Sequence, residues 1–198
     1  MIAILDYGSG NLRSAQRAFE LTGHEVRITS DPTIALAADG LVVPGVGAFG
    51  ACMKQLEDID GARIIAERVQ SQKSLLGICV GMQILFTSGT EKGSHPGVGI
   101  LEGEISELHA PVLPHIGWNT VKAPQNSKLF SGIEEESFYF VHSYGAQKTN
   151  RDALVTTTEY GADFIAAVEY GHVSATQFHP EKSGKAGASL IANWVKTL

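Results

Sequence analysis

The sequence contains only two cysteines, Cys52 and Cys79, among its 198 residues, so it has no disulfide framework and suits a reducing compartment. It also lacks any cluster of five or more lysines and arginines, and its 21 acidic residues outnumber its 15 basic ones. The net charge of −6 argues against a nucleic-acid partner, because phosphate recognition needs a basic surface. No apolar run approaches the roughly 20 residues of a membrane span, and the N-terminus has no basic signal-peptide region. We therefore expect a cytoplasmic protein without nucleic-acid or membrane partners.

The composition that remains is typical of a compact globular protein, with 43% hydrophobic and 18% charged residues. The length leaves room for one domain over residues 1–198, which we expect to fold without a metal or disulfide. No spacing of Cys and His residues indicates a metal site.

Short apolar runs alternate with helical stretches before residue 95, which predicts a doubly wound, mostly parallel α/β sheet. The expected strands there are residues 2–5, 25–29, 41–43 and 74–78. The expected helices include residues 11–21, 48–59, 61–72 and 82–87. Six later segments predict an antiparallel or mixed extension of the sheet, namely residues 98–108, 115–122, 138–146, 153–158, 164–169 and 172–177. A final helix over about 184–197 should pack back onto the sheet.

The strongest local signal is the pentapeptide Gly77-Ile78-Cys79-Val80-Gly81 between a predicted strand and a predicted helix. It has the form G-x-C-x-G, the thiol counterpart of a nucleophile elbow. Glycines on both sides relieve crowding at a sharp turn, and the helix N-terminus that follows favours a thiolate. The alternative is a buried structural cysteine, which remains the better interpretation of Cys52 because that residue lacks this context.

A thiol nucleophile needs a base, and the base needs a group that orients it. Pro180 favours an extended conformation at His179, so a period of two should place His179 and Glu181 on one face. That pair alone could be an ordinary surface pair, but next to a reactive Cys79 it predicts a base and its orienting carboxylate. Four other histidines lie in turns or beside prolines with nothing obvious to hold them, namely His24, His95, His109 and His115.

The loop Pro44-Gly45-Val46-Gly47 ends a predicted strand and should line the ligand crevice of a doubly wound sheet. One of its N–H groups, together with the N–H of Val80, predicts an oxyanion hole. The alternative is an ordinary tight turn. The similar Gly8-Ser9-Gly10 is not a dinucleotide fingerprint, because Arg13 stands where its third glycine would be.

Taken together, the PGVG loop, the elbow GICVGMQ and the terminal FHPEKSG resemble the class I glutamine amidotransferase family. The resemblance implies a flavodoxin-like fold of that family and a triad of Cys79, His179 and Glu181. It implies that Cys79 attacks the side-chain amide of glutamine, that a thioester forms, and that His179 passes a proton to the leaving ammonia. Val80 stands where leucine is more usual, but its backbone N–H should serve equally well.

Three further short motifs, YGSGNL, HIGWN and YFVHSY, resemble motifs of the glutaminase subunits of imidazole glycerol phosphate synthases. This implies a heterodimer with a (β/α)8-barrel cyclase subunit and no metal or organic cofactor. The resemblance implies that bound glutamine contacts Gly47, Gln83, His142, Ser143 and Tyr144. It also implies that the partner faces Asn11, Trp118, Tyr139 and Lys182, although core packing is an equal alternative for Trp118 and Tyr139.

Two other functions remain open on the sequence. One is a glutaminase subunit of another ammonia-transferring synthase, such as that of pyridoxal phosphate. The other is a catalytically idle, flavodoxin-like binding subunit, in which Cys79 would not react with a glutamine-like electrophile.

Overall fold

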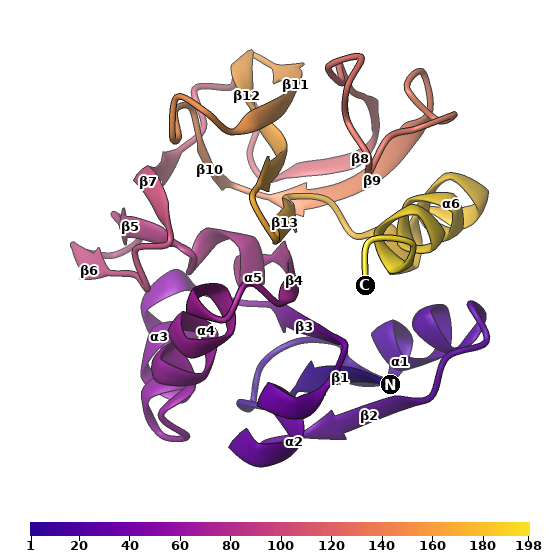
Figure 1. Cartoon of the computed structure of the whole chain (residues 1–198). Helices are drawn as coiled ribbons and strands as arrows, with labels where there is room; N and C mark the ends of the chain where they lie inside the picture. Colours follow the sequence, from indigo (N-terminus) through magenta and orange to yellow (C-terminus); the bar gives the residue numbers. More distant parts are fainter.

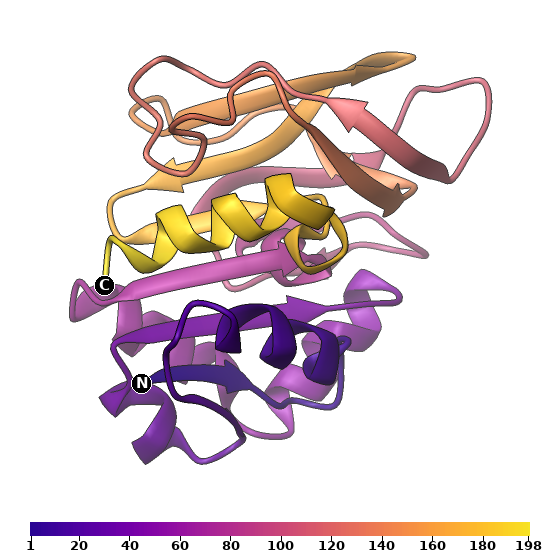
Figure 2. The same ribbon diagram turned by 90° about the vertical axis from the view of Figure 1, so that its right-hand side faces the viewer.

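A seven-stranded sheet forms the centre of the computed structural model, which describes all 198 residues. Its strand order is β11-β12-β13-β4-β3-β1-β2 (Figures 1 and 2). These strands are β1 (Ile2–Leu5), β2 (Val26–Thr29), β3 (Gly40–Gly45), β4 (Ser74–Cys79), β11 (Leu154–Tyr160), β12 (Ala162–Tyr170) and β13 (Val173–Thr176). The five strands from β13 to β2 run parallel, whereas β12 is antiparallel to both of its neighbours. The predicted doubly wound, mostly parallel sheet is confirmed.

Helices cover both faces of this sheet (Figure 1). They are α1 (Leu12–Glu20), α2 (Pro32–Ala37), α3 (Phe49–Glu57), α4 (Gly61–Gln70), the short α5 (Val80–Gln83) and α6 (Gly184–Val195). On one face α6 packs against α1, where Trp194 meets Phe19 edge to face at 5.6 Å between ring centroids. On the other face α4 contacts both α2 and α3. No helix is both long and apolar enough to cross a membrane.

Among the later strands, β11 and β12 form the expected antiparallel extension at one edge of the central sheet, and β13 joins the sheet in parallel beside β4. The other later strands form two separate sheets. A four-stranded sheet has the order β10-β7-β5-β6, from β5 (Phe86–Gly89), β6 (His95–Pro96), β7 (Leu101–Glu107) and β10 (Tyr144–Ala146). The remaining pair is β8 (His115–Thr120) and β9 (Ser137–His142), which are antiparallel.

The helix expected over 82–87 was wrong in its extent, because α5 ends at Gln83 and β5 begins at Phe86. The backbone of β5 pairs with β7, and that long-range pairing overrides the local helical pattern. Gly89 at the end of β5 lies so close to the ring of Phe49 that a Cβ there would clash.

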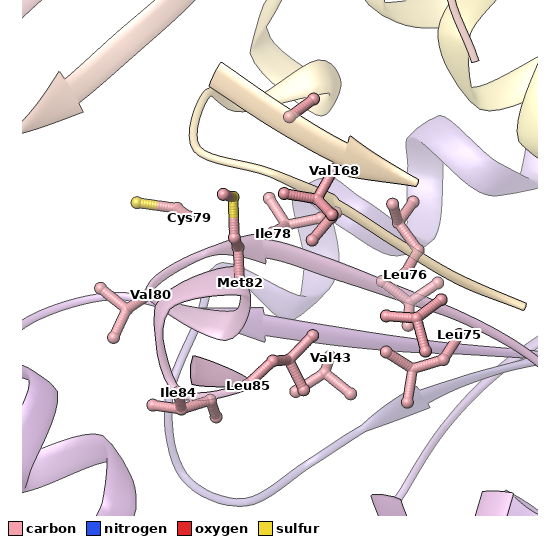
Figure 3. Close-up of a cluster of buried hydrophobic side chains, with 14 of the residues drawn as sticks. Val43, Leu75, Leu76, Ile78, Cys79, Val80, Met82, Ile84, Leu85 and Val168 are labelled. Carbon is pink, nitrogen blue, oxygen red and sulfur yellow. The ribbon is translucent and has the colours of Figure 1, made fainter. Parts of the chain in front are cut away.

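The interior is a continuous cluster of 49 buried hydrophobic residues. All residues of β3 and β4 are buried, as expected for central parallel strands. Figure 3 shows Leu75 and Leu76 of β4 inside this cluster and the Cys79 side chain at its margin, pointing away. β4 therefore lies in the core along most of its length and ends with Cys79 at the edge of the core.

Candidate active site

Cys79 lies at the carboxyl end of β4, where the strand turns directly into α5. Its backbone has φ 55° and ψ −115°, a conformation that a side chain rarely adopts. A Cβ at Gly81 would collide with the carbonyl oxygen of Val43, and one at Gly77 would lie 2.8 Å from the carbonyl oxygen of Gly81. The two glycines of G-x-C-x-G are therefore required by the close approach of the turn to neighbouring backbone.

Gly45 is Cys79's partner in the β3–β4 register. A Cβ at Gly45 would lie 2.5 Å from the backbone nitrogen of Gly81. The glycine thus lets the PGVG loop approach the elbow closely.

His179 reaches Cys79 because β13 pairs in parallel with β4, so both chains end at the same edge of the sheet. It has an extended backbone with φ −100° and ψ 96°, as Pro180 predicted. Its Nδ1 lies 2.7 Å from Oε1 of Glu181, and both side chains are buried. The reason given for this pair was wrong, however, because Pro180–Lys182 is a turn of 3₁₀ helix (η1) rather than a continued strand.

The charge of His179 is set by these two neighbours. Burial by itself lowers the pKa of the imidazole, but the hydrogen bonds and charges of Cys79 and Glu181 outweigh it and raise the pKa to about 9. At neutral pH the ring therefore holds a proton beside the Cys79 sulfur. The second oxygen of Glu181, Oε2, is buried without a partner.

Ser183 fixes the segment that carries His179. Its hydroxyl donates to the carbonyl of His179 at 2.7 Å and accepts the N–H of Tyr139 at 2.9 Å. His179 N–H in turn donates to the Tyr139 carbonyl at 3.0 Å. Ser183 stands at the N-cap of α6 but makes no capping bond, because its hydroxyl is used here instead.

A pocket of about 370 Å³ opens over Cys79 and His179, a volume suited to a small ligand. Its wall is formed by Val46, Gly47, Cys79, Val80, Gln83, Glu91, Pro114, Val141, His142, Ser143, Tyr144, His179 and Lys182. The structure thus brings the predicted triad together with most of the predicted substrate-binding residues.

The PGVG loop presents one free N–H and one bound N–H. Val46 N–H donates to the Ser9 hydroxyl at 3.0 Å, and this hydroxyl also contacts the Val46 carbonyl at 2.9 Å. The Cys52 thiol donates to the same carbonyl at 3.2 Å, which gives this second cysteine a structural role. Gly47 N–H, at φ 91°, makes no hydrogen bond within the protein. In this state Val46 N–H is therefore unavailable to a ligand, whereas Gly47 N–H is available.

Gln83 is buried, and its amide nitrogen is occupied inside the protein. It donates to the Tyr144 carbonyl at 2.8 Å and to Oε1 of Gln177 at 3.0 Å. Gln177, which the sequence analysis did not single out, in turn places its Nε2 3.9 Å from the Cys79 sulfur. The only sequence signal for Gln177 was its place two residues before His179.

Glu91 was also missed, because it lies in a loop with no recognisable motif. Its Oε2 accepts the N–H of Phe49 at 2.9 Å and so caps α3, whose own N-cap residue, Ala48, has no side-chain acceptor. It is the single acidic side chain among the pocket residues.

The residues expected to face a partner surround the same region. Trp118 is 59% exposed and so does not pack in the core, while Tyr139 is half-buried with its ring centroid 6.1 Å away. Lys182 is exposed at the pocket. Asn11 is also exposed, and its side chain caps α1 through the N–H of Ser14.

Comparison with known proteins places this geometry in context. The model of the family described as glutamine amidotransferase class-I matches residues 3–198. The imidazole glycerol phosphate synthase subunit HisH of Mycobacterium bovis is 57% identical, over 100% of this chain and 98% of the relative. The HisH proteins of Corynebacterium diphtheriae and Thermobifida fusca are each 55% identical over 100% of this chain and 99% and 98% of their own lengths.

Solved structures agree on the fold. A glutamine amidotransferase crystal structure superposes with a TM-score of 0.79 at 18% identity, covering 98% of this chain and 97% of the other. The structure of PurLQS from Thermotoga maritima gives a TM-score of 0.74 at 20% identity, covering 99% and 97%.

Proposed function

The chain belongs to the class I glutamine amidotransferase family, and we propose that it is the glutaminase subunit of an imidazole glycerol phosphate synthase. The observation that carries this proposal is the meeting of Cys79, His179 and Glu181 at one pocket, in a chain 57% identical to such a subunit. The reaction converts glutamine to glutamate and supplies ammonia for histidine biosynthesis in the cytoplasm.

The reaction begins when Cys79, as a thiolate beside the protonated His179, attacks the side-chain amide carbon of glutamine. His179, protonated at neutral pH, gives its proton to the departing nitrogen, so the C–N bond breaks and ammonia leaves. Water then attacks the γ-glutamyl thioester while His179 takes its proton, and glutamate departs as the sulfur is regenerated. Glu181 holds Nδ1 of the imidazole and stabilises its positive charge throughout.

Negative charge develops on the amide oxygen during both attacks. Val80, the first residue of α5, has an N–H with no partner inside the helix, and Gly47 N–H is also free. We assign these two donors to the oxyanion hole. An oxyanion-hole donor of this kind contributes about 10²–10³ in rate.

Glutamine brings a charged α-amino group into a pocket that has one carboxylate. Oε2 of Glu91 is occupied by Phe49 N–H, which leaves Oε1 to pair with the ammonium of the substrate. The backbone of Ser143 and Tyr144 supplies the facing wall. The pocket therefore favours an amino acid with a side-chain amide over a simple amide.

The released ammonia must not enter bulk water, where it would take up a proton near neutral pH and lose its nucleophilic electron pair. The exposed apolar residues Ile116 and Trp118, both 59% exposed on β8, provide a surface for a partner beside the pocket. Asn11, Tyr139 and Lys182 extend that surface. The partner is a (β/α)8-barrel cyclase subunit, which forms a heterodimer with this chain and makes imidazole glycerol phosphate and aminoimidazole carboxamide ribotide.

Two measurements test this function. Glutamate release is measured with the cyclase subunit and its acceptor nucleotide present, and we expect Cys79→Ala to abolish it while added ammonium salt still supports the cyclase. A glutamine-like diazo-ketone should label Cys79 and leave the fully buried Cys52 unmodified, as read by peptide mass spectrometry. Absence of labelling would favour an idle binding subunit, and stimulation by a different synthase would reassign the partner.

A further inference from the structure

Two buried histidines outside the triad lie directly opposite each other on neighbouring strands. His115 on β8 pairs with His142 on β9 in the antiparallel register, and their nearest ring nitrogens are 3.3 Å apart. Both side chains are at least nine-tenths buried, at 3% and 7% exposed. His142 lines the pocket, whereas His115 does not.

The hydrogen positions of this pair follow from their partners. Nδ1 of His142 lies 2.8 Å from the carbonyl oxygen of Tyr144, which can only accept, so Nδ1 carries the hydrogen. Burial lowers the pKa of His142 to about 4, so the ring is neutral and its Nε2 carries none. Nδ1 of His115, facing that nitrogen, must therefore be the donor. A single arrangement of hydrogens satisfies both rings.

The chain of bonds ends on the wall of the pocket. The Tyr144 carbonyl accepts from His142 and from Gln83, both at 2.8 Å, and the segment from His142 to Tyr144 lines the pocket. His115 itself is fixed by near-parallel stacking on Tyr160, at 4.0 Å between centroids, and on Phe140, at 5.0 Å.

We propose that His115 is a positioning residue for glutamine binding, which holds the imidazole of His142 through its Nε2 and thereby supports the Tyr144 carbonyl and the pocket wall. Without its donor, Nε2 of His142 is left unpaired in a buried site, so the ring turns toward another partner and gives up its hydrogen bond to the Tyr144 carbonyl, after which either neutral tautomer can form. The proposal rests on the glutaminase function for its kinetic effect, but the state of His142 can be read without any reaction.

Two variants separate hydrogen bonding from packing. His115→Phe keeps an aromatic ring to stack on Tyr160 and Phe140 but removes the donor. His115→Asn removes the ring but keeps an amide N–H close to the position of Nδ1. If His115 acts only by packing, the asparagine variant should be the more damaged of the two.

The experiment combines imidazole ¹⁵N NMR of the folded chain with glutaminase kinetics of the complex with the cyclase. We expect His142 to show one neutral tautomer, with hydrogen on Nδ1, in the wild-type chain and in His115→Asn, and a mixture in His115→Phe. We expect His115→Phe to raise KM for glutamine about tenfold with kcat within about twofold, and His115→Asn to restore KM. A single unchanged tautomer and normal KM in His115→Phe would overturn the proposal, as would hydrogen on Nε2 of His142 in the wild-type chain. A wild-type complex without glutaminase activity would instead refute the proposed function, leaving the NMR result to decide the role of His115.

Discussion

Replacing Glu181 with glutamine removes the charge beside His179 while keeping the shape of the side chain. The rise in the pKa of His179 from 6.5 to about 9 corresponds to about 3 kcal/mol in favour of the imidazolium. Burial opposes this rise, while Cys79 and Glu181 produce it, with Cys79 the larger contributor. We therefore assign roughly half of it, on the order of 1–2 kcal/mol, to Glu181.

The variant should show this loss in a pH profile of glutamate release measured with the partner present. In the wild type, activity falls as the pH rises through about 9, because His179 then loses the proton needed by the leaving ammonia. In Glu181→Gln the midpoint of this fall should move about one pH unit toward neutrality. The rate at neutral pH should drop by at least about tenfold, and by as much as about 10⁴-fold if the imidazole also takes the wrong tautomer.

The free energy of unfolding provides a second test, because the pKa of His179 fixes the direction in which it changes with pH. A pKa raised by folding stabilises the protein below pH 6.5, and this contribution is lost as the pH rises through about 9. Glu181→Gln should therefore lower the free energy of unfolding by roughly 1–2 kcal/mol more at pH 6 than at pH 9.5, measured by urea denaturation. The exposed Glu135→Gln serves as the matched control and should change neither curve. An alkaline midpoint that stays in place in Glu181→Gln would refute the reasoning.

Three other changes test separate parts of the molecule. Ser9→Ala releases the Val46 N–H, which can then turn to the oxyanion as a third donor beside Gly47 and Val80. Because about 1 kcal/mol of hydrogen bonding no longer holds that N–H away, we expect the glutaminase rate without partner to rise about fivefold, and an unchanged rate would mean that Val46 takes no part. Arg68→Met removes a fully buried guanidinium that donates to five backbone carbonyls. Urea denaturation should therefore show a free energy of unfolding about 3 kcal/mol lower, and a loss below about 1 kcal/mol would contradict this account. Trp118→Ala should weaken partner binding at least about 30-fold by calorimetry with little change in thermal stability, and unchanged affinity would place the interface elsewhere.

The residues proposed to be catalytic could be singled out from the sequence because local patterns, together with the family resemblance, point to them. The glycines flanking Cys79 are needed by a turn that spans only a few residues, and Pro180 sets the backbone of its own neighbour, His179. The pairing of His179 with Glu181 was expected for the wrong reason, since a strand and a 3₁₀ turn can both bring residues two apart together.

What the sequence could not supply are contacts between distant segments. The hydroxyl that binds Val46 N–H belongs to Ser9, 37 positions earlier, and nothing near Val46 predicts it. His115 looked unsupported in its own surroundings, yet strand register places it against His142. Contacts of this kind depend on which strands are neighbours in a sheet and on their register. The pattern of apolar residues predicts which face of each strand is buried, but it does not predict which strands pair.

β13 is the last strand in the chain, yet it lies between β4 and β12, and β12 joins the central sheet only through it. The same strand leads directly to His179. A nascent or truncated chain that lacks this segment can neither complete its sheet nor place a base beside its thiol, so an unfinished molecule is also an inert one. We therefore expect glutamine hydrolysis to begin only after the last strand has entered the sheet.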